Sequence, residues 1–327
     1  MRINHTILFS LAVVALAAHS DSTSAQVYPS RPITMVVPLA AGGPLDTIAR
    51  ILAEPMRASL GQPVIVENVT GAAGTVGTGR VARAAPDGYT FGMGFLGTLV
   101  LNGAIYALPY DVVKDLEPIA LISSNPHVIV AKAALPAKDL RELIGWLKLN
   151  QDKASAGTAG AGSSTHVAGL LFQQLTGVRF QLVPYRGAAP ALQDVMAGQI
   201  DLMVDVASNS LPYLQGGKIK AYAVAASTRL ASASEIPTVD EAGLPGFYMS
   251  TWYGLYGPKA MPSDVVAKLN AAAVHALADP VVGRRFADLG LDILPRERQT
   301  AEALATLQRS EIEKWWPIIK AANIKPE

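Results

Sequence analysis

The stretch that decides the fold spans residues 33–60 and reads ITMVVPLAAGGPLDTIARILAEPMRASL. Its first five residues, 33–37, are apolar and mostly β-branched, so they predict a short buried strand. The loop 39–44 follows, and from Asp46 apolar residues recur at helical spacing up to Gly61, which stands where a C-terminal cap belongs. A strand, a glycine-containing loop and a helix in this order are the repeating unit of an α/β fold.

The same alternation continues along the chain. Further strands are predicted at 64–66, 89–93, 127–131, 154–158, 180–183, 202–206 and 221–225. Further helices are predicted at 76–84, 139–149, 167–175, 190–197, 263–277 and 301–319. Pro55 is expected to kink or shorten the first helix, because an interior proline costs about 3 kcal/mol. Such strict alternation favours parallel sheets covered by helices.

Composition excludes several classes of protein. A length of 327 residues suggests two domains, and 50% hydrophobic with only 16% charged residues excludes intrinsic disorder. The formal charge is +1 without a long single-sign run, so nucleic acid is not expected as a partner. Cysteine is absent, which excludes disulfides and cysteine-bound zinc. Five histidines stand singly, so no metal site is predicted.

The N-terminus has the order of a secretory signal peptide. Arg2 and His5 form a basic start, residues 7–18 are apolar, and the small residues 23–25 suit a signal peptidase, which predicts cleavage after Ala25. The alternative is an N-terminal core helix. The apolar stretch has about half of the ~20 residues that a membrane-spanning helix needs, so no such helix is expected.

Two loops share one design, at residues 40–46 and 160–166. Each follows a predicted strand, contains small residues and glycine, and leads into a helix. Free N–H groups at a helix start, approached closely over glycine, can bind an anion without lysine or arginine. The alternative is that both are ordinary turns. Both would lie at the carboxyl ends of parallel strands, where ligands collect in open sheets.

Two aspartates lie near these positions. A carboxylate beside an anionic ligand is repulsive unless a proton, hydroxyl or water intervenes. Asp46 is therefore expected to cap its own helix by accepting that helix's backbone donors. Asp205 ends a predicted strand near Ser208 and Asn209, so it either faces a cleft or satisfies a neighbouring loop, and both interpretations stay open.

Catalytic motifs are weak. Residues 92–97, GMGFLG, match the spelling of a dinucleotide fingerprint, but no long helix or suitably placed acid follows, so the match is taken as coincidence. Neither a P-loop nor a GxSxG elbow is present. His166 with Ser163 or Ser164 could suggest a nucleophilic pair, but residues this close at a helix start normally cap it.

Many ordered motifs resemble those of one known family, the Bug-type extracytoplasmic solute receptors of tripartite tricarboxylate transporters. The matching segments are 28–33, 38–46, 67–74, 86–90, 109–111, 157–166, 184–187, 198–201, 237–246, Trp252 and Pro258. The resemblance implies a type II periplasmic-binding-protein fold, with two α/β domains around a ligand cleft. It implies one domain of residues 26–124 plus 251–327, a second of residues 125–250, and chain crossings near 123–126 and 249–252.

The resemblance also implies a binding site for a small carboxylate. Carried over by position, the ligand-binding residues are Leu39, Ala40, Ala41, Gly42, Gly43, Asp46, Gly97, Thr98, Gly162, Ser163, Ser164, Thr165, His166, Tyr185 and Asp205. Leu45, Phe95 and Leu96 are apolar where relatives often have polar residues, so a ligand with an aliphatic or aromatic body is expected.

The function expected from this resemblance is a periplasmic receptor, not an enzyme. It would capture a di-, tri- or aromatic carboxylic acid as a monomer, without metal or cofactor, and present it to the membrane permease of a tripartite transporter. Two alternatives stay open at this point. One is a ligand-sensing partner of a sensor kinase, and the other is a secreted hydrolase that uses Ser163 or Ser164 with His166.

Overall fold

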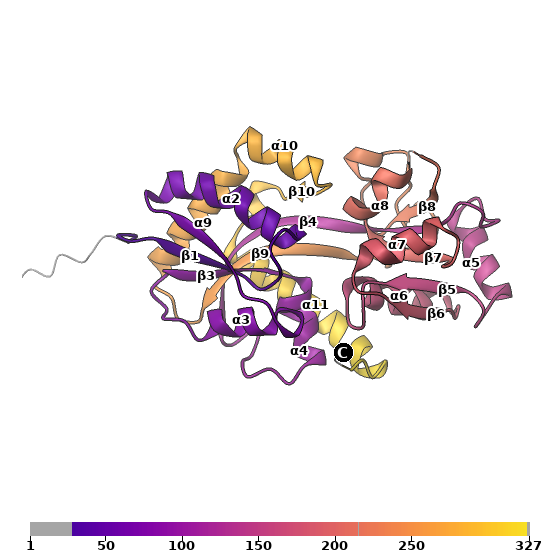
Figure 1. Cartoon of the computed structure of the whole chain (residues 1–327), viewed down its shortest axis with the longest axis horizontal. Coiled ribbons are helices and arrows are strands. Elements are labelled where there is room, and N and C mark those ends of the chain that lie inside the picture. The colour runs from indigo at the N-terminus through magenta and orange to yellow at the C-terminus, as the bar shows by residue number, and fades with distance from the viewer. Residues whose placement is uncertain (1–27, 215, 326–327) are drawn as a thin grey trace, which may run out of the picture.

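The computed structural model describes residues 28–214 and 216–325. Its elements form two groups, joined by the long strands β4 (Leu116–Lys132) and β9 (Ser250–Pro258) (Figure 1). We call the group that holds the first and the last elements of the chain the first lobe, and the group between β4 and β9 the second lobe. The predicted signal peptide, residues 1–25, lies outside the described residues.

The first lobe is built on three parallel strands, β2–β1–β3, with β9 antiparallel beside β3. Its strands are β1 (Ile33–Val37), β2 (Val64–Asn68), β3 (Thr90–Phe95) and the short β10 (Asp292–Ile293). Its helices are α2 (Pro44–Leu60), η1 (Ala72–Gly74), α3 (Thr75–Ala82), η2 (Gly97–Leu101), α4 (Asn102–Ile105), α9 (Ser263–Leu277), α10 (Pro280–Asp288), η4 (Arg296–Arg298) and α11 (Ala301–Ala321). Helices α2 and α10 lie on one side of this lobe, and α3 and α4 lie on the other (Figure 1).

The second lobe repeats the plan with a second set of parallel strands, β7–β5–β6. Its strands are β5 (Ser155–Thr158), β6 (Gln181–Pro184), β7 (Leu202–Val206) and β8 (Ile219–Val224). Its helices are α5 (Leu140–Leu149), α6 (Ser164–Thr176), α7 (Ala188–Met196), α8 (Ala207–Leu214) and η3 (Ala231–Ala233). Both β7 and β8 pair antiparallel with the second half of β4.

The chain passes between the lobes along β4 and returns along β9. The two strands pair antiparallel through the crossing, with Ser124 opposite Trp252 and Asn125 opposite Thr251. The register shifts between Leu121 and Ser123, just before the crossing. A continuous sheet in the order β2-β1-β3-β9-β4-β7-β5-β6 therefore runs through both lobes.

Pro55 does not shorten the first helix, because α2 continues through it to Leu60. Met56 and Leu60, which follow the proline, are both buried in the core of the first lobe. Burying each such side chain is worth about 1.5–3 kcal/mol, which offsets the cost of about 3 kcal/mol for an interior proline. Gly61 closes the helix in the left-handed conformation, as the sequence predicts.

The prediction of parallel sheets is correct for β2–β1–β3 and β7–β5–β6 and wrong for β4, β8, β9 and β10, which make antiparallel pairs. The predicted strand 127–131 is only the last part of β4, which begins at Leu116. Polar residues at 123–125 and a proline at 126 interrupt the apolar run, so the sequence pattern hides the length of this strand. The apolar pattern predicts neither β9 nor α10, and only the resemblance implies a crossing near 249–252, where β9 begins.

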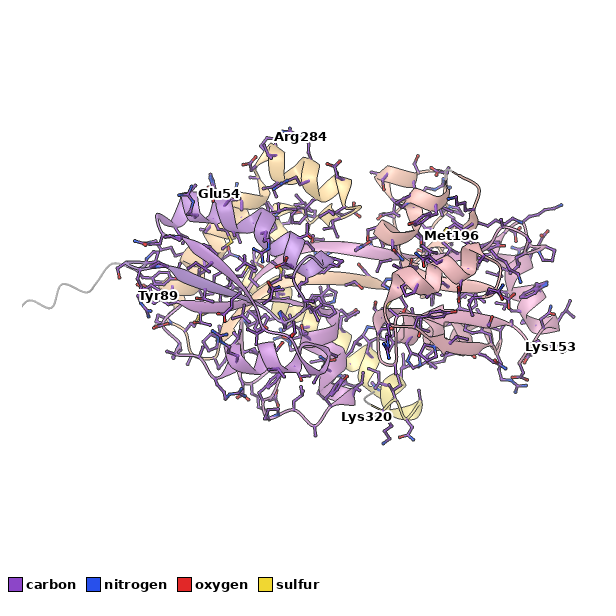
Figure 2. All side chains as sticks on the ribbon, viewed as in Figure 1. Glu54, Tyr89, Lys153, Met196, Arg284 and Lys320 are labelled. Carbon is purple, nitrogen blue, oxygen red and sulfur yellow. The ribbon has the colours of Figure 1, made fainter. Side chains whose placement is uncertain are left out.

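Buried apolar side chains fill both lobes. One cluster lies between the first-lobe strands and helices α2 and α9, a second extends from the first lobe into the second along α6 and α11, and a third lies under α7 and α8. Charged side chains such as Glu54 and Arg284 point outward (Figure 2). Among the described helices, none alone is long and apolar enough to cross a membrane, although the pair α9 and α10, bent by 73°, passes by length and composition.

Candidate functional site

A cavity of about 560 Å³ lies between the lobes, on the side of α2 and α10. The first lobe contributes Gly42, Pro44, Thr47, Ile48, Tyr253, Asp288, Leu289 and Leu291. The second lobe and its part of β4 contribute Asn125, Arg186, Gly187, Ala188, Ala189, Pro190, Val206, Ser208 and Asn209. The walls are thus built by the starts of three helices, α2, α7 and α8, and the volume is typical of small-molecule sites.

The start of α2 forms part of the first-lobe wall. Its N-cap is Gly43, and no side chain caps the helix. Pro44 occupies the first helical position, where its missing N–H costs nothing. The following amides have no acceptor within the helix, because the first four N–H groups of any helix lack an intrahelical partner. This helix start therefore offers uncapped donors and the positive end of the helix dipole.

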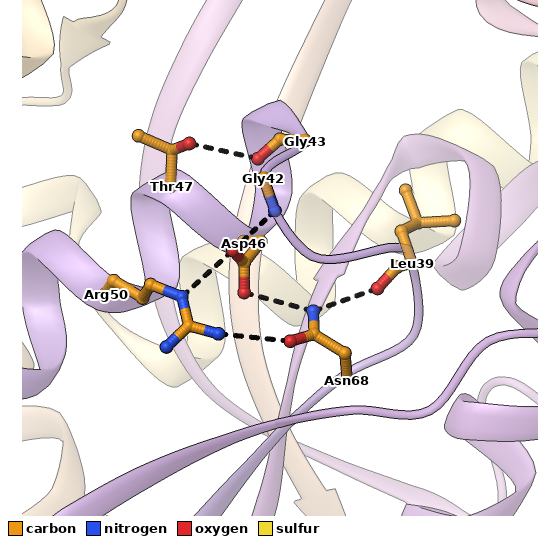
Figure 3. Close-up of polar contacts among 7 residues, drawn as sticks. All are labelled: Leu39, Gly42, Gly43, Asp46, Thr47, Arg50 and Asn68. Carbon is orange, nitrogen blue, oxygen red and sulfur yellow. Dashed lines mark hydrogen bonds and ion pairs between the residues drawn. The ribbon is translucent and has the colours of Figure 1, made fainter.

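Asp46 holds the loop that precedes α2 (Figure 3). Its Oδ2 accepts hydrogen bonds from the Gly42 amide at 2.8 Å and from Arg50 Nε at 2.9 Å. Its Oδ1 accepts from Asn68 Nδ2 at 3.0 Å, and that amide also donates to the Leu39 carbonyl. Burial alone would raise the pKa of Asp46, but these hydrogen bonds and the Arg50 charge outweigh it and hold the pKa below its usual range.

The predicted capping role of Asp46 therefore needs a correction. Its backbone donor is Gly42, which precedes the helix, and not an amide of the helix itself. The side chain reaches backward, as in a capping box, because it sits at the third helical position. With both oxygens occupied, Asp46 shapes the glycine loop and leaves the helix amides uncapped.

The start of α7 faces the same cavity from the second lobe. Its N-cap is again a glycine, Gly187, and again no side chain caps the helix. The two alanines that follow line the cavity, and Pro190 comes next. Two uncapped helix starts, one on each lobe, thus share one cavity. Arg186 stands directly before this second helix start and also lines the cavity.

Asp205 supports the third helix start and does not line the cavity. Its Oδ2 accepts from Asn209 Nδ2 and from Ser210 Oγ, each at 2.7 Å. The side chain is completely buried, and this burial raises its pKa to about 6 in spite of those hydrogen bonds. Of the two interpretations left open, the structure shows Asp205 satisfying the first turns of α8, where Ser208 and Asn209 do line the cavity.

The polar groups of the loop 160–166 make hydrogen bonds within the loop and to the residue before it. Ser163 caps α6 by accepting from the His166 amide, and its hydroxyl donates to the Gly160 carbonyl at 2.7 Å. Thr165 Oγ1 accepts from the Ala159 amide at 2.7 Å, and the Gly162 amide donates to His166 Nδ1 at 2.9 Å. None of the residues 162–166 is among those that line the cavity.

Gly162 instead lies against the first lobe. A Cβ at this position would come 2.4 Å from Ile105 Cδ1 in α4. The loop 160–166 therefore forms part of a contact between the lobes on the side of α4, away from the start of α2. The two loops that share one design in the sequence lie at different places between the lobes, and the α2 loop has α7 and α8 as its neighbours across the cavity.

The remaining predicted residues have local partners. Thr98, in η2 beside Gly97, is buried, and its hydroxyl contacts the backbone of Phe95 at 3.3 Å. Tyr185 donates to Asp194 Oδ2 at 2.5 Å and is directed toward α7. Burial and the Asp194 carboxylate raise the pKa of Tyr185 to about 12, so the phenol stays protonated.

His127 contacts Ser164, which no sequence pattern predicts. His127 lies on β4 and is completely buried, and its Nε2 is 3.3 Å from Ser164 Oγ across 37 residues of sequence. Burial lowers the pKa of His127 to about 3, so the ring is neutral. No described hydrogen-bond partner meets its Nδ1. The pair connects the crossing strand to the start of α6 but lacks the acid that orients the base of a nucleophilic triad.

A second cavity, of about 300 Å³, lies between the lobes on the side of α11. Two of its charged side chains are already engaged. Lys314 Nζ donates to the Tyr248 carbonyl of the second lobe at 2.5 Å, and Glu311 accepts from Trp315 Nε1 at 2.7 Å. Because Lys314 serves the contact between the lobes and Glu311 is bonded within α11, the cavity of α2 and α7 is the better candidate for a ligand.

The sequence predicts a lining residue on the first-lobe wall of this cavity and none on the second-lobe wall. Gly42 is the predicted residue that lines the cavity, whereas Arg186, Asn125 and Tyr253 were not predicted. The signal for Arg186 was present, since β6, a glycine and a helix repeat the design of the α2 loop. Leu45, Phe95 and Leu96, from which an apolar ligand body is expected, do not line the cavity, and Leu45 and Leu96 are buried in the core. Ile48, Leu289 and Leu291 supply apolar lining in their place.

Comparison with known proteins agrees with this architecture. The model of a family described as the tripartite tricarboxylate transporter family receptor matches residues 48–324. The chain is similar to the solved structure of MatC from Rhodopseudomonas palustris with bound malate, with 41% identity and a TM-score of 0.77, over 89% of this chain and 100% of that one.

Two further solved structures are similar over almost the whole chain. The periplasmic binding protein BugD is 39% identical with a TM-score of 0.76, over 92% of this chain and 100% of its own. A second R. palustris protein, solved with adipate, is 29% identical with a TM-score of 0.78, over the same shares of the two chains.

Proposed function

This chain belongs to the receptor family of the tripartite tricarboxylate transporters, and we propose that it captures a small organic carboxylate in the cavity between α2 and α7. As a member of that family it is a solute-binding receptor with a mixed α/β periplasmic-binding-protein fold, and it is not an enzyme. The hydrolase alternative is therefore excluded.

The observation that carries the proposal is the pair of uncapped helix starts on opposite walls of one cavity. Backbone N–H groups and helix dipoles at both starts favour negative charge. A carboxylate can therefore be held without a lysine or arginine in the α2 loop. The apolar side chains of Ile48, Leu289 and Leu291 supply contact for a hydrocarbon body. The malate and adipate bound by two relatives have this chemistry.

From the first lobe, the proposed site takes Gly42 at the cavity wall, the rest of the loop 39–43 as its frame, and the support of Asp46. The other predicted residues, Gly97, Thr98, Gly162–His166, Tyr185 and Asp205, are assigned to local structure outside the cavity lining. This assignment is supported by their hydrogen bonds, which engage neighbouring backbone and side chains.

Ligand capture proceeds by movement of two domains, 26–124 plus 251–327 and 125–250, about the paired crossing strands. Residues of both lobes line the cavity, so a change in the angle between the lobes about β4 and β9 changes its width. Closure excludes water from the bound carboxylate and strengthens its hydrogen bonds.

The bound acid is delivered to the membrane permease of a tripartite transporter, and the family membership supports this destination. The receptor acts as a monomer in the periplasm, after removal of residues 1–25. Presentation to a sensor kinase is the alternative destination for the same loaded receptor.

Calorimetry with malate and adipate tests the proposal, using the mature chain from Gln26. Saturable binding of either acid is expected, together with a more compact profile in solution scattering. The methyl esters of the same acids are the control, because they keep the body and lose the charges. Equal affinity for acid and ester, or no binding of either acid, would refute carboxylate capture.

A further inference from the structure

Arg186 is a positively charged side chain that lines the cavity. The loops 40–46 and 160–166 contain no lysine or arginine. Arg186 lies between β6 and α7 and lines the second-lobe wall of the cavity. Its side chain is exposed and makes no hydrogen bond or ion pair with any residue in the described part of the chain. It is thus available to a ligand.

The charge of Arg186 has the same sign as the helix end that it precedes. It directly precedes Gly187, the N-cap of α7, and lines the same cavity as that helix start. Cations are stabilising at the other end of a helix. An anion placed here interacts favourably with both the guanidinium and the uncapped amides. A guanidinium also matches a carboxylate with two parallel hydrogen bonds.

The floor of the cavity supplies a further donor. Tyr253, on β9, is 7% exposed and lines the cavity between the two walls. Burial raises its pKa to about 12, so its hydroxyl is protonated at neutral pH. The first-lobe wall has the α2 helix start for one acidic group, and the second-lobe wall has Arg186 for another.

We propose that Arg186 is a specificity-determining residue that selects ligands with a second acidic group over monocarboxylates of the same chain length. This inference rests on the proposed function, since it concerns which acids the same cavity selects. One carboxylate lies at the start of α2, and the second lies against Arg186 across the cavity. The backbone donors alone accept either kind of acid.

The alternative role for Arg186 is an ion pair with Asp288. Asp288 ends α10 in the first-lobe wall, also lines the cavity, and has no ion-pair partner among the described residues. Arg186 and Asp288 therefore face one cavity from opposite lobes with opposite charge. If they paired with each other when the lobes close, they would strengthen the binding of every acid equally. If Arg186 binds the ligand, Asp288 instead repels the second carboxylate.

The test measures dissociation constants by calorimetry for two matched pairs, succinate with butyrate and adipate with hexanoate. The wild-type receptor is expected to bind the diacid of at least one pair ten times or more tightly than the monoacid. Arg186→Gln should reduce that ratio to below threefold and leave monoacid affinity within twofold. Arg186→Lys should keep an intermediate ratio. Arg179→Gln is the matched control, because Arg179 is an exposed second-lobe arginine paired with Asp152 away from the cavity, and it should change nothing.

Asp288→Asn separates the two interpretations. If Arg186 reads the second carboxylate, removal of the Asp288 charge strengthens diacid binding about twofold or more and leaves the monoacid unchanged. Equal weakening of both acids by Arg186→Gln and by Asp288→Asn would show that the two residues pair with each other, and would overturn the inference. An unchanged ratio in Arg186→Gln would also overturn it while carboxylate capture stands. Failure of the wild-type receptor to bind any of the four acids would refute the proposed function itself.

Discussion

Gly290 in the first lobe packs so closely against Ser208 in the second that a Cβ at position 290 would lie 2.9 Å from the Ser208 Cα. Ser208 in turn accepts a hydrogen bond from Asn125 Nδ2 at 2.6 Å and donates its amide to Asn125 Oδ1 at 3.4 Å. Asn125 lies on the crossing strand β4, and both it and Ser208 line the candidate cavity. This contact therefore connects the loop after α10, the crossing strand and the start of α8.

Replacing Gly290 by alanine is expected to lower the free energy of unfolding by about 2–4 kcal/mol, because strain at its φ of +65° adds to the clash with Ser208. Gly177→Ala is the matched control. Gly177 has a φ of +69° and no neighbour within 4 Å of a new Cβ, so it should cost only about 1–2 kcal/mol of strain. Urea denaturation measures the free energy of unfolding of both variants. Equal decreases would contradict the prediction, because they would show that Ser208 moves aside at no cost.

Gly43→Val is expected to abolish carboxylate binding while the circular dichroism spectrum stays unchanged. Position 43 has an ordinary φ of −77°, and a new Cβ would contact only the Ala40 carbonyl oxygen at 3.4 Å, so the fold tolerates the change. The branched side chain would cover the amides at the start of α2. Gly145→Val, in the open middle of α5, is the control. Calorimetry that finds wild-type affinity in the Gly43 variant would place the carboxylate elsewhere.

Asp46→Asn should weaken binding and also change how stability responds to acid. The folded protein holds the pKa of Asp46 below its unfolded value, so this carboxylate stabilises the fold above pH 4 and loses that contribution as pH falls further. The amide loses the charge that pairs with Arg50 and should cost about 1–3 kcal/mol at pH 7. Unfolding curves at pH 3.5 and pH 7 check this, and the difference between wild type and variant should shrink at the lower pH. A difference that does not depend on pH would contradict it.

Asp205 should give the opposite dependence on pH. Its folded pKa of about 6 exceeds the unfolded value near 4, so the folded state binds more protons between these values and stability falls as pH rises through them. The total effect is on the order of 2–3 kcal/mol. Asp205→Asn keeps an acceptor for Ser210 and should be relatively more stable than wild type at pH 8 than at pH 4.5. Parallel pH profiles for the two proteins would mean that Asp205 is charged throughout.

The predictable part of the fold is the part with local signals. The strand at 33–37, the helix ending at Gly61 and the strand at 202–206 follow from apolar spacing and from one cap, and they occur as predicted. The length of β4 could not be predicted this way, since its polar middle is paired with β9, whose residues lie more than 120 positions away in the sequence. Long-range pairing overrides local composition there.

The candidate site shows the same limit. The glycine loop before α2 was recognisable because an anion site at a helix start has a local sequence pattern. The partner of that loop across the cavity depends on how the lobes face each other, which no local pattern encodes. The loop at 160–166 was the more obvious match by composition, yet Ser163 caps its helix, whereas the less obvious start at Gly187 is uncapped and lines the cavity.

The paired strands β4 and β9 have a mechanical consequence for the range of ligands. A hydrogen-bonded ribbon of two strands resists sliding, because slippage would break the ladder from Ser123 to Pro126 at once, but it yields to bending and twist, especially beside the register shift at Leu121–Ser123. In the proposed closure, the walls at α2 and α7 would tilt toward each other without changing which residues face across the cavity. The same residues would then contact acids of different chain length, with only the angle between the lobes changed. One set of cavity residues could therefore bind several acids that differ in length.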